Sequence, residues 1–146
     1  METKRFNLRV YGLLINEHDE VLLADERRNG YAFTKFPGGG LEWGEGITDC
    51  LKREFQEELG IDIEIGALYY LTDFFQQSAF SENDQLVSTY YRVEVRDLSV
   101  IMCHPKPDSG DYEVFRWVKC EDLSVDEMTF PVDKIVAGKL KKGSSH

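Results

Sequence analysis

The apolar residues of this chain fall into short runs separated by polar links, a pattern typical of β-strands. The runs are rich in β-branched, aromatic and aliphatic side chains. The predicted strands are residues 6–15, 21–24, 63–72, 86–95 and 112–118. A short polar turn separates the first two runs, so we expect these strands to form a hairpin. The polar segment that follows them, residues 25–31, is predicted to be a loop.

Two other segments carry a helical pattern. In the first, apolar residues recur every four positions, at Ile47, Leu51, Phe55 and Leu59. Such a stripe can anchor a helix on a sheet. Gly60 stands where a left-handed C-cap would end this helix. The second segment, residues 131–141, has a proline at its first turn and is predicted to be a closing helix.

The remaining segments are predicted to be loops and turns. Residues 37–40 (PGGG) are expected to be neither helix nor regular strand. Residues 100–102 either extend the strand at 86–95 or pair with it, and residues 120–123 suggest a short helical turn. Residues 105–110 form a loop by composition, with two prolines and one glycine.

Together these elements predict one α/β domain. A chain of 146 residues can bury about two-thirds of its surface in a single core and leaves no room for a second ordinary domain. We expect the domain to span residues 1–141 and residues 142–146 to form an unstructured tail. The order of strands, loop, helix, strands and closing helix predicts a mixed sheet with helices packed against it.

Composition and charge limit the function. Charged residues make up 30% of the chain and hydrophobic residues 42%, as in ordinary globular proteins. The formal net charge is −10, which argues against a polymeric nucleic acid as partner. No apolar run approaches the ~18 residues of a membrane span and no signal-peptide core is present, so we expect no membrane association and a cytoplasmic location. The widely spaced Cys50, Cys103 and Cys120 are expected to be free thiols.

Acidic side chains gather on one face of the first predicted helix. Glu54, Glu57 and Glu58 have the spacing i, i+3, i+4, which puts all three carboxylates on the same side. Like charges at this spacing destabilise a helix, so the arrangement calls for a counterion. A hard divalent cation with oxygen ligands is the natural one. The three glycines at positions 38–40 would let backbone approach a metal or a phosphate closely.

A longer motif surrounds these glutamates. Gly39 is followed after five residues by Glu45 and, after seven more, by the run Arg53 to Ile61 (REFQEELGI). This pattern resembles the signature box of the Nudix hydrolases, and every demanded position is filled. The resemblance implies a Nudix-type α/β/α sandwich with a central mixed sheet and flanking helices. It also implies hydrolysis of a diphosphate bond with Mg²⁺, for which Mn²⁺ can substitute.

The resemblance also implies roles for individual residues. Glu54, Glu57 and Glu58 would be the catalytic and metal-binding carboxylates, joined by a carbonyl of Gly38 or Gly39. Glu54 is either a metal ligand or the general base that accepts a proton from water. The number of metal ions stays open.

Two box residues outside this set, Arg53 and Glu45, can pair to fix the loop against the helix. Many members of the family draw a further carboxylate from outside the box. The candidates here are Glu113 and Asp111, of which Glu113 is preferred. Glu113 is either the general base or a solvent-exposed residue at the end of a strand.

Substrate-binding residues are less well indicated. Arg27, Arg28 and Lys35 could bind a substrate phosphate or lie in solvent, and Glu113 is a further candidate on the substrate side. The loop at residues 74–85 contains three phenylalanines that either stack on a base or close the edge of the core. Residues 76–79 (QQSA) lack the proline or tyrosine that marks some family subclasses.

The sequence therefore predicts a Mg²⁺-dependent pyrophosphohydrolase. Its substrate would be a nucleoside diphosphate linked to another group, such as an NDP-sugar, an ADP-ribose-like compound or a nucleoside triphosphate. The alternative is a non-catalytic Nudix module that senses a nucleotide. An acidic calcium-binding module is excluded because no D-x-D-x-D-G loop occurs. The partner is expected to be a small nucleotide, and assembly into a homodimer is allowed.

Overall fold

The computed structural model describes residues 3–143, which contain seven β-strands and two α-helices. The strands are β1 (Arg5–Leu14), β2 (Glu20–Arg28), β3 (Tyr31–Lys35), β4 (Gly38–Gly40), β5 (Glu64–Leu71), β6 (Asp84–Glu94) and β7 (Tyr112–Lys119). The helices are α1 (Ile47–Leu59) and α2 (Pro131–Gly143). Short 3₁₀ turns lie at Leu98–Val100, Cys120–Asp122 and Val125–Glu127.

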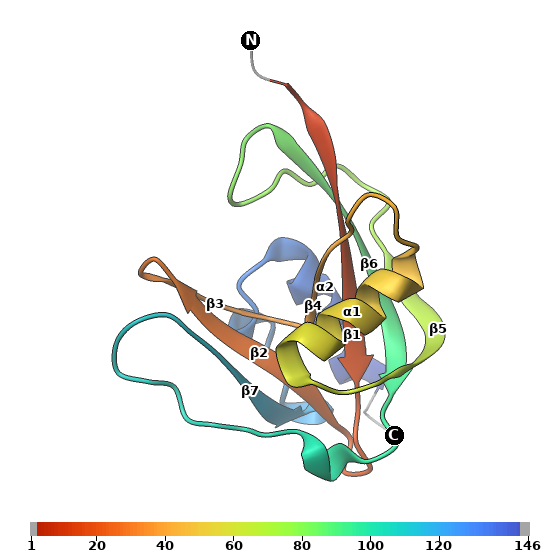
Figure 1. The fold of residues 1–146 in the computed structure, drawn as a ribbon, viewed down its shortest axis with the longest axis vertical. Coiled ribbons are helices and arrows are strands. Elements are labelled where there is room, and N and C mark those ends of the chain that lie inside the picture. The colour runs from red at the N-terminus through yellow and green to blue at the C-terminus, as the bar shows by residue number, and fades with distance from the viewer. Residues whose placement is uncertain (1–2, 144–146) are drawn as a thin grey trace.

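The strands divide between two sheets (Figure 1). The first is mixed, with the order β4-β1-β6-β5, and its central pair β1 and β6 is parallel. The second is antiparallel, with the order β3-β2-β7. Helix α1 crosses in front of β1 in Figure 1, and α2 lies behind the sheets. The predicted mixed sheet between flanking helices is thus confirmed, and the second sheet is an addition to it.

The core has two halves, one under each helix. Val10 and Leu14 of β1 belong to the half that packs against α1, where Phe55 is fully buried. The alternate β1 residue Leu13 belongs to the half that packs against α2. Successive strand residues point to opposite faces, so a strand covered on both sides is apolar at nearly every position. This explains the unbroken apolar runs in β1 and β2.

The predicted hairpin between the first two strands is wrong. Strand β1 pairs with β4 and β6, whereas β2 pairs with β3 and β7. A single bridge between Ile15 and Val21 is all that connects β1 and β2 as antiparallel neighbours within the described residues. The turn between β1 and β2 therefore connects the two sheets, because each strand forms a longer pairing with strands of its own sheet.

The predicted loop at residues 25–31 is also wrong, because β2 continues to Arg28 and β3 begins at Tyr31. Asn29 and Gly30 form the turn between them, with φ of 52° and 81°. Two positive φ values are typical of a type I′ turn, for which Asn-Gly is a favoured pair. The sequence thus contained the signal for this hairpin, and the hairpin places residues 25–28 in a sheet.

Three smaller expectations also differ from the structure. The glycines at 38–40 form the short edge strand β4 on β1, so they are not a loop. The segment at residues 100–102 is not a strand: Val100 ends the 3₁₀ turn Leu98–Val100, and residues 101–102 follow this turn. Helix α2 includes Lys142 and Gly143, which were assigned to the tail, and residues 144–146 lie outside the described part. In residues 3–143 no helix is long and apolar enough to span a membrane.

Candidate active site

Helix α1 presents the acidic residues of the box to the glycine strand β4. It ends as expected at Gly60, which adopts a left-handed conformation with φ of 66° and donates its N–H to the Gln56 carbonyl. Arg53 connects the helix to the preceding loop. Its Nε and Nη2 donate to the two carboxylate oxygens of Glu45 at 2.9 and 2.8 Å, which confirms the predicted pair. A second bond from Arg53 Nη2 reaches the Gly40 carbonyl at 3.1 Å.

Glu54 lies directly against β4. A Cβ placed on Gly39 would come within 2.6 Å of the Glu54 carboxylate, so the glycine at this position makes the approach possible. Arg53 Nη1 donates to Glu54 Oε1 at 3.0 Å and holds the side chain in place. The Glu54 side chain is largely buried yet lines a cavity, and it is therefore both oriented and accessible to a ligand.

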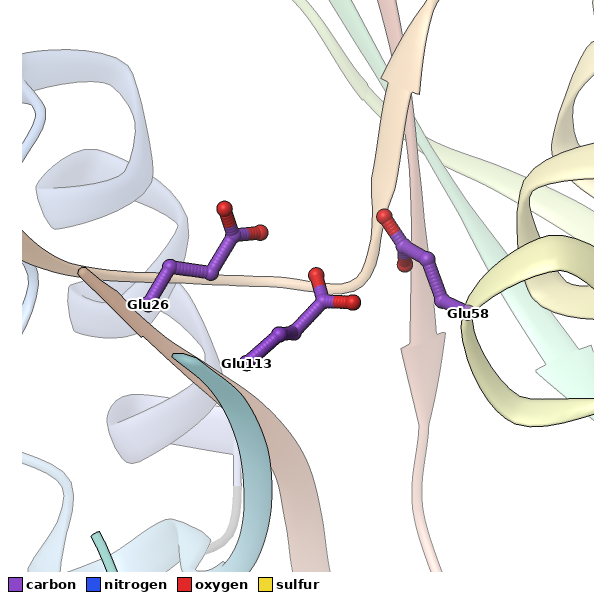
Figure 2. A group of neighbouring side chains, drawn as sticks. All are labelled: Glu26, Glu58 and Glu113. Carbon is purple, nitrogen blue, oxygen red and sulfur yellow. The ribbon is translucent and has the colours of Figure 1, made fainter. Parts of the chain in front are cut away.

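Glu58, one turn further along α1, meets two glutamates from the second sheet. Glu26 of β2 and Glu113 of β7 are direct cross-strand neighbours, and both extend toward Glu58 (Figure 2). One oxygen from each of the three carboxylates lies within 4.8 Å of the others. We call these three residues the glutamate cluster. Its members come from the second sheet and from helix α1.

Burial and mutual repulsion control the charges of the glutamate cluster. Burial, together with the charges of Glu54 and Glu26, raises the pKa of Glu58 to about 7, although Lys35 opposes this shift. Burial and a hydrogen bond with Glu26 raise the pKa of Glu113 well above its ordinary value. Burial alone would raise the pKa of Glu26, but its bond with Glu113 and the neighbouring cations hold it below the ordinary range. In the absence of a metal ion, burial and repulsion therefore favour the protonated form of Glu113.

The ammonium group of Lys35 balances part of this negative charge. Its Nζ lies 3.4 Å from Glu26 Oε1 and 3.8 Å from Glu58 Oε1. It also donates to the carbonyl oxygens of Gly38 and Phe36 at 3.0 and 3.4 Å. The side chain is only 7% exposed. The Lys35 ammonium group therefore occupies a site that is lined by carboxylate and carbonyl oxygens.

The glutamate cluster fits a divalent metal ion. Within residues 3–143, the buried oxygens Glu58 Oε2 and Glu113 Oε2 have no hydrogen-bond partner, and Glu26 Oε1 is reached only by the Lys35 ammonium at 3.4 Å. Unpartnered buried carboxylate oxygens are costly unless a cation or a donor reaches them. Carboxylate and carbonyl oxygens are the ligands that Mg²⁺ prefers. Together with Glu54 and the Gly38 carbonyl, the cluster offers the donor set of a magnesium site.

Two residues predicted for the site lie away from its centre. The Glu57 side chain is 59% exposed, is bound to Arg53 Nη1 at 3.2 Å, and does not line the cavity. Arg27 is directed toward the loop before β7, where it donates to the carbonyls of Gly110 and Pro107 and covers the Tyr112 ring. By contrast, Arg28 lines the cavity and pairs with Glu26 at 3.1 Å.

A cavity of about 840 Å³ extends from the glutamate cluster to the start of α2. Its lining also includes an aromatic group formed by Tyr31, Phe33, Phe80 and Phe130, and Phe33 is the cross-strand neighbour of Glu26. Each ring in this group lies 5.4 to 6.0 Å from a neighbouring ring. The loop phenylalanine Phe80 is 67% exposed, so it offers an open face for stacking. Phe36, by contrast, is fully buried.

Asp133 of α2 lines the same cavity and is 2% exposed. Its Oδ1 accepts a hydrogen bond from the Tyr90 hydroxyl at 2.5 Å, while Oδ2 has no partner among the described residues. Burial raises the pKa of Asp133 to about 6, and the Tyr90 bond, Lys35 and Arg9 oppose this shift. At neutral pH this carboxylate therefore has one free acceptor atom facing the cavity.

Sequence reasoning missed three residues of this cavity. Glu26 was assigned to a loop, and only the Asn29-Gly30 hairpin signal could have placed it on a strand. Arg9 and Asp133 line the cavity from β1 and α2. No local pattern marks these two residues, because each lies among apolar neighbours of an ordinary strand or helix.

The mixed sheet between two helices, with a glycine strand and an acidic helix at one cavity, defines a Nudix-type hydrolase domain. Residues 5–138 match the family model described as the NUDIX domain, and the chain belongs to this family. Nudix hydrolases act on phosphoric anhydride bonds.

Individual relatives support the same assignment. The chain is 24% identical over 133 residues to the 8-oxo-dGTP diphosphatase of Escherichia coli (strain K12), which covers 90% of this chain and 93% of that protein. It is 35% identical over 65 residues to the 8-oxo-dGTP diphosphatase of Proteus vulgaris, a match to 43% of this chain and 57% of that protein. A NUDIX hydrolase structure from Nitrosomonas europaea has a TM-score of 0.71 at 19% identity, covering 97% of this chain and 92% of that one.

Proposed function

We propose that this chain hydrolyses a nucleoside triphosphate with Mg²⁺ as cofactor, releasing a nucleoside monophosphate and pyrophosphate. The observation that carries the proposal is the single cavity that joins the glutamate cluster to the aromatic group and Asp133. The carboxylates suit a charged phosphate chain with its metal, and the aromatic group suits a flat base. The names of the bacterial relatives favour a triphosphate over an NDP-sugar or an ADP-ribose-like substrate.

The residues that would hold Mg²⁺ are Glu26, Glu58 and Glu113, whose oxygens lie within 4.8 Å of one another, and Glu54 and the Gly38 carbonyl could join them from the same cavity. A bound Mg²⁺ would neutralise phosphate oxygens and make water a better nucleophile. Mn²⁺ has similar ligand preferences and should substitute. Glu57 would act indirectly, by holding Arg53 at the end of the site.

Glu54 is the residue we assign to accept the proton of the attacking water. It is held by Arg53 beside the Gly39 backbone and faces the cavity. A general base must lie within reach of the attacking water, and Glu54 lines the cavity whereas Glu113 does not. Water loses its proton to the Glu54 carboxylate and its oxygen bonds to phosphorus, while the anhydride oxygen leaves with the pyrophosphate.

The nucleoside would lie against the aromatic group and Asp133. The aromatic group supplies faces on which a base can stack. The free Oδ2 of Asp133 accepts N–H donors, and its ionised form can accept two at once. A guanine-type edge, with adjacent ring and exocyclic N–H groups, fits this acceptor better than an edge of carbonyl oxygens.

The test is a substrate panel with purified protein and Mg²⁺, with products identified by chromatography. The panel contains the common and oxidised nucleoside triphosphates, NDP-sugars and ADP-ribose. We expect the highest kcat/KM for a guanine-type triphosphate and no turnover in excess chelator. If only NDP-sugars are hydrolysed, the proposed triphosphate substrate is wrong. Tight binding without turnover of any compound would favour a nucleotide sensor. Cytoplasmic location and homodimer assembly stay predictions.

A further inference from the structure

Among the described residues, three cationic side chains line the cavity: Arg9, Arg28 and Lys35. Lys35 is surrounded by two carboxylates and two carbonyl oxygens. Arg28 pairs with Glu26 at 3.1 Å. These two cations are therefore already occupied by acceptors of the protein. Arg9 differs from both, since no carboxylate of residues 3–143 lies within ion-pair distance of it.

The Arg9 guanidinium is nevertheless held in a fixed position. Its Nε donates to the Tyr11 hydroxyl at 3.1 Å. Tyr11 is 7% exposed and stacks on Tyr90, with ring centroids 5.1 Å apart. In the described part of the chain the two terminal nitrogens of Arg9 have no acceptor, although the side chain is mostly enclosed. An oriented guanidinium with two open amino groups is suited to binding an oxyanion in a bidentate manner.

The neighbouring glycine strand leaves the space for this side chain. Gly40 is the cross-strand partner of Arg9, and a Cβ added to Gly40 would lie 3.1 Å from Arg9 Nη1. Gly39 makes room for the Glu54 carboxylate in a similar way. Two adjacent glycines of β4 therefore accommodate one anionic and one cationic side chain at the same cavity.

Contacts connect Arg9 to both Glu54 and Asp133. Gly40, which faces Arg9, is next to Gly39, which faces the Glu54 carboxylate. Arg9 also bonds to Tyr11, whose ring stacks on Tyr90, the donor to Asp133. Glu54 is proposed to act at the anhydride and Asp133 to bind the base, and in a nucleotide the phosphate attached to the sugar connects these two parts.

We propose that Arg9 binds the phosphate group attached to the nucleoside of the substrate, and that it keeps this contact with the nucleoside monophosphate product. The proposal rests on the proposed function for the identity of the ligand. Arg9 is then a substrate-binding residue that adds affinity without taking part in proton transfer. Its loss should weaken the binding of substrate and of monophosphate product alike, because the same contact exists before and after the reaction.

The direct test measures binding of nucleoside 5′-monophosphates and of the matching nucleosides by calorimetry, in Mg²⁺. Monophosphates contain no anhydride bond, so the readout does not depend on turnover. We expect Arg9→Gln to weaken binding of the best monophosphate by about tenfold or more, as for loss of a charge-assisted bidentate contact, and to leave nucleoside binding unchanged. Arg9→Lys retains the positive charge but not the planar guanidinium group. Its affinity for the monophosphate should therefore lie between those of the wild type and Arg9→Gln. Arg96→Gln removes the same charge from an exposed position and should match the wild type.

A second variant keeps the test independent of the folding of Arg9→Gln. Gly40→Ala should displace the guanidinium and weaken monophosphate binding, and it should have little further effect when Arg9 is already replaced. The proposal is overturned if the wild type binds monophosphates no tighter than nucleosides, or if Arg9→Gln weakens both ligands equally. Arg9-dependent binding without turnover of any panel compound would contradict the proposed hydrolysis and leave the Arg9 site intact.

Discussion

Four glutamates with the same side-chain chemistry occupy four different environments in this protein. Glu57 is solvent-exposed beside Arg53, and Glu54 is oriented against the backbone of Gly39. Glu58 is buried with a pKa of about 7, and Glu113 has a still higher pKa through burial and its bond to Glu26. The four side chains differ in their desolvation and in the charges near them, so their replacement by glutamine should have different effects.

The first prediction compares two adjacent residues of α1. Glu58→Gln should reduce kcat by about 10²-fold or more, because it removes an oriented charge at the reacting centre. Glu57→Gln should reduce kcat much less, since this side chain lies outside the cavity. In chelator at about pH 8 the Glu58→Gln protein should be at least as thermally stable as the wild type, because a buried charge is lost. An equal loss of kcat in the two variants would show that Glu57 moves into the site.

The second prediction concerns the proton acceptor. Glu54→Gln should lower kcat by about 10²–10⁴ with little change in KM, the usual range for loss of a general base. Glu113→Gln should cost less than about tenfold, because glutamine resembles the protonated form of this residue. Both variants are measured at saturating Mg²⁺ so that weakened metal binding does not affect kcat. A larger loss from Glu113→Gln would move the base onto β7.

At the scale of elements, the three-residue strand β4 organises the site more than its length suggests. Gly38 has φ of +144°, and a Cβ there would meet the Val10 carbonyl oxygen at 2.1 Å. Gly39 faces Glu54 and Gly40 faces Arg9. Helix α1 is fixed to the same strand through the Arg53 bond to the Gly40 carbonyl. The strand and the helix therefore form one unit, and a small change in β4 should be felt by the carboxylates of α1.

A third prediction tests this coupling. In Gly39→Ala the new methyl group would lie within 2.6 Å of the Glu54 carboxylate, so Glu54 must move. We expect kcat to fall by about 10²-fold, as for an approximately 1 Å displacement of a catalytic group. The matched control is Gly143→Ala, where the added methyl group meets open space. Circular dichroism should show the same fold for both proteins, and normal activity of Gly39→Ala would mean that Glu54 has no fixed position.

At the scale of the whole molecule, the second sheet concentrates negative charge against α1. The chain carries a net charge of −10, and the glutamate cluster collects part of it in one buried place. The folded-state pKa of Glu58 lies above its ordinary value of 4.5, and Asp133 and Glu113 are shifted in the same direction. The folded protein thus binds more protons than the unfolded chain across this range of pH, and its stability falls as the pH rises.

The fourth prediction follows from this sign. In chelator the melting temperature should decrease from about pH 5.5 to about pH 8.5. The change should be steepest at the lower end, where Glu58, Asp133 and Glu113 all hold protons that the unfolded chain has released, and it should flatten above the pKa of Glu58. Added Mg²⁺ should restore stability most at the higher pH, where the carboxylates are ionised. Calorimetric scans of Glu58→Gln should give a flatter pH profile, while Glu57→Gln should follow the wild type. A melting temperature that rises with pH in chelator would contradict the assigned charges.

The sequence by itself determined the family, the mixed α/β fold and the limits of α1. These features depend on residues that are close in the chain. The stripe that includes Leu51 and Phe55 builds one helix face, Gly60 ends the helix, and Arg53 reaches Glu45 within the same motif. The i, i+4 spacing also placed Glu54 and Glu58 together at the cavity. The metal-binding and catalytic roles of these residues stay predictions.

Only the tertiary structure decided which distant groups meet. Glu26 and Glu113 are brought together by the register of β2 and β7, and Lys35 lies between Glu26 and Glu58 because β3 returns beside β2. Strand pairing depends on the packing of the whole core and not on the local sequence, which is why the expected hairpin of β1 with β2 did not form. The same holds for Arg9 and Asp133, which become neighbours of one cavity only when β1 and α2 pack around it.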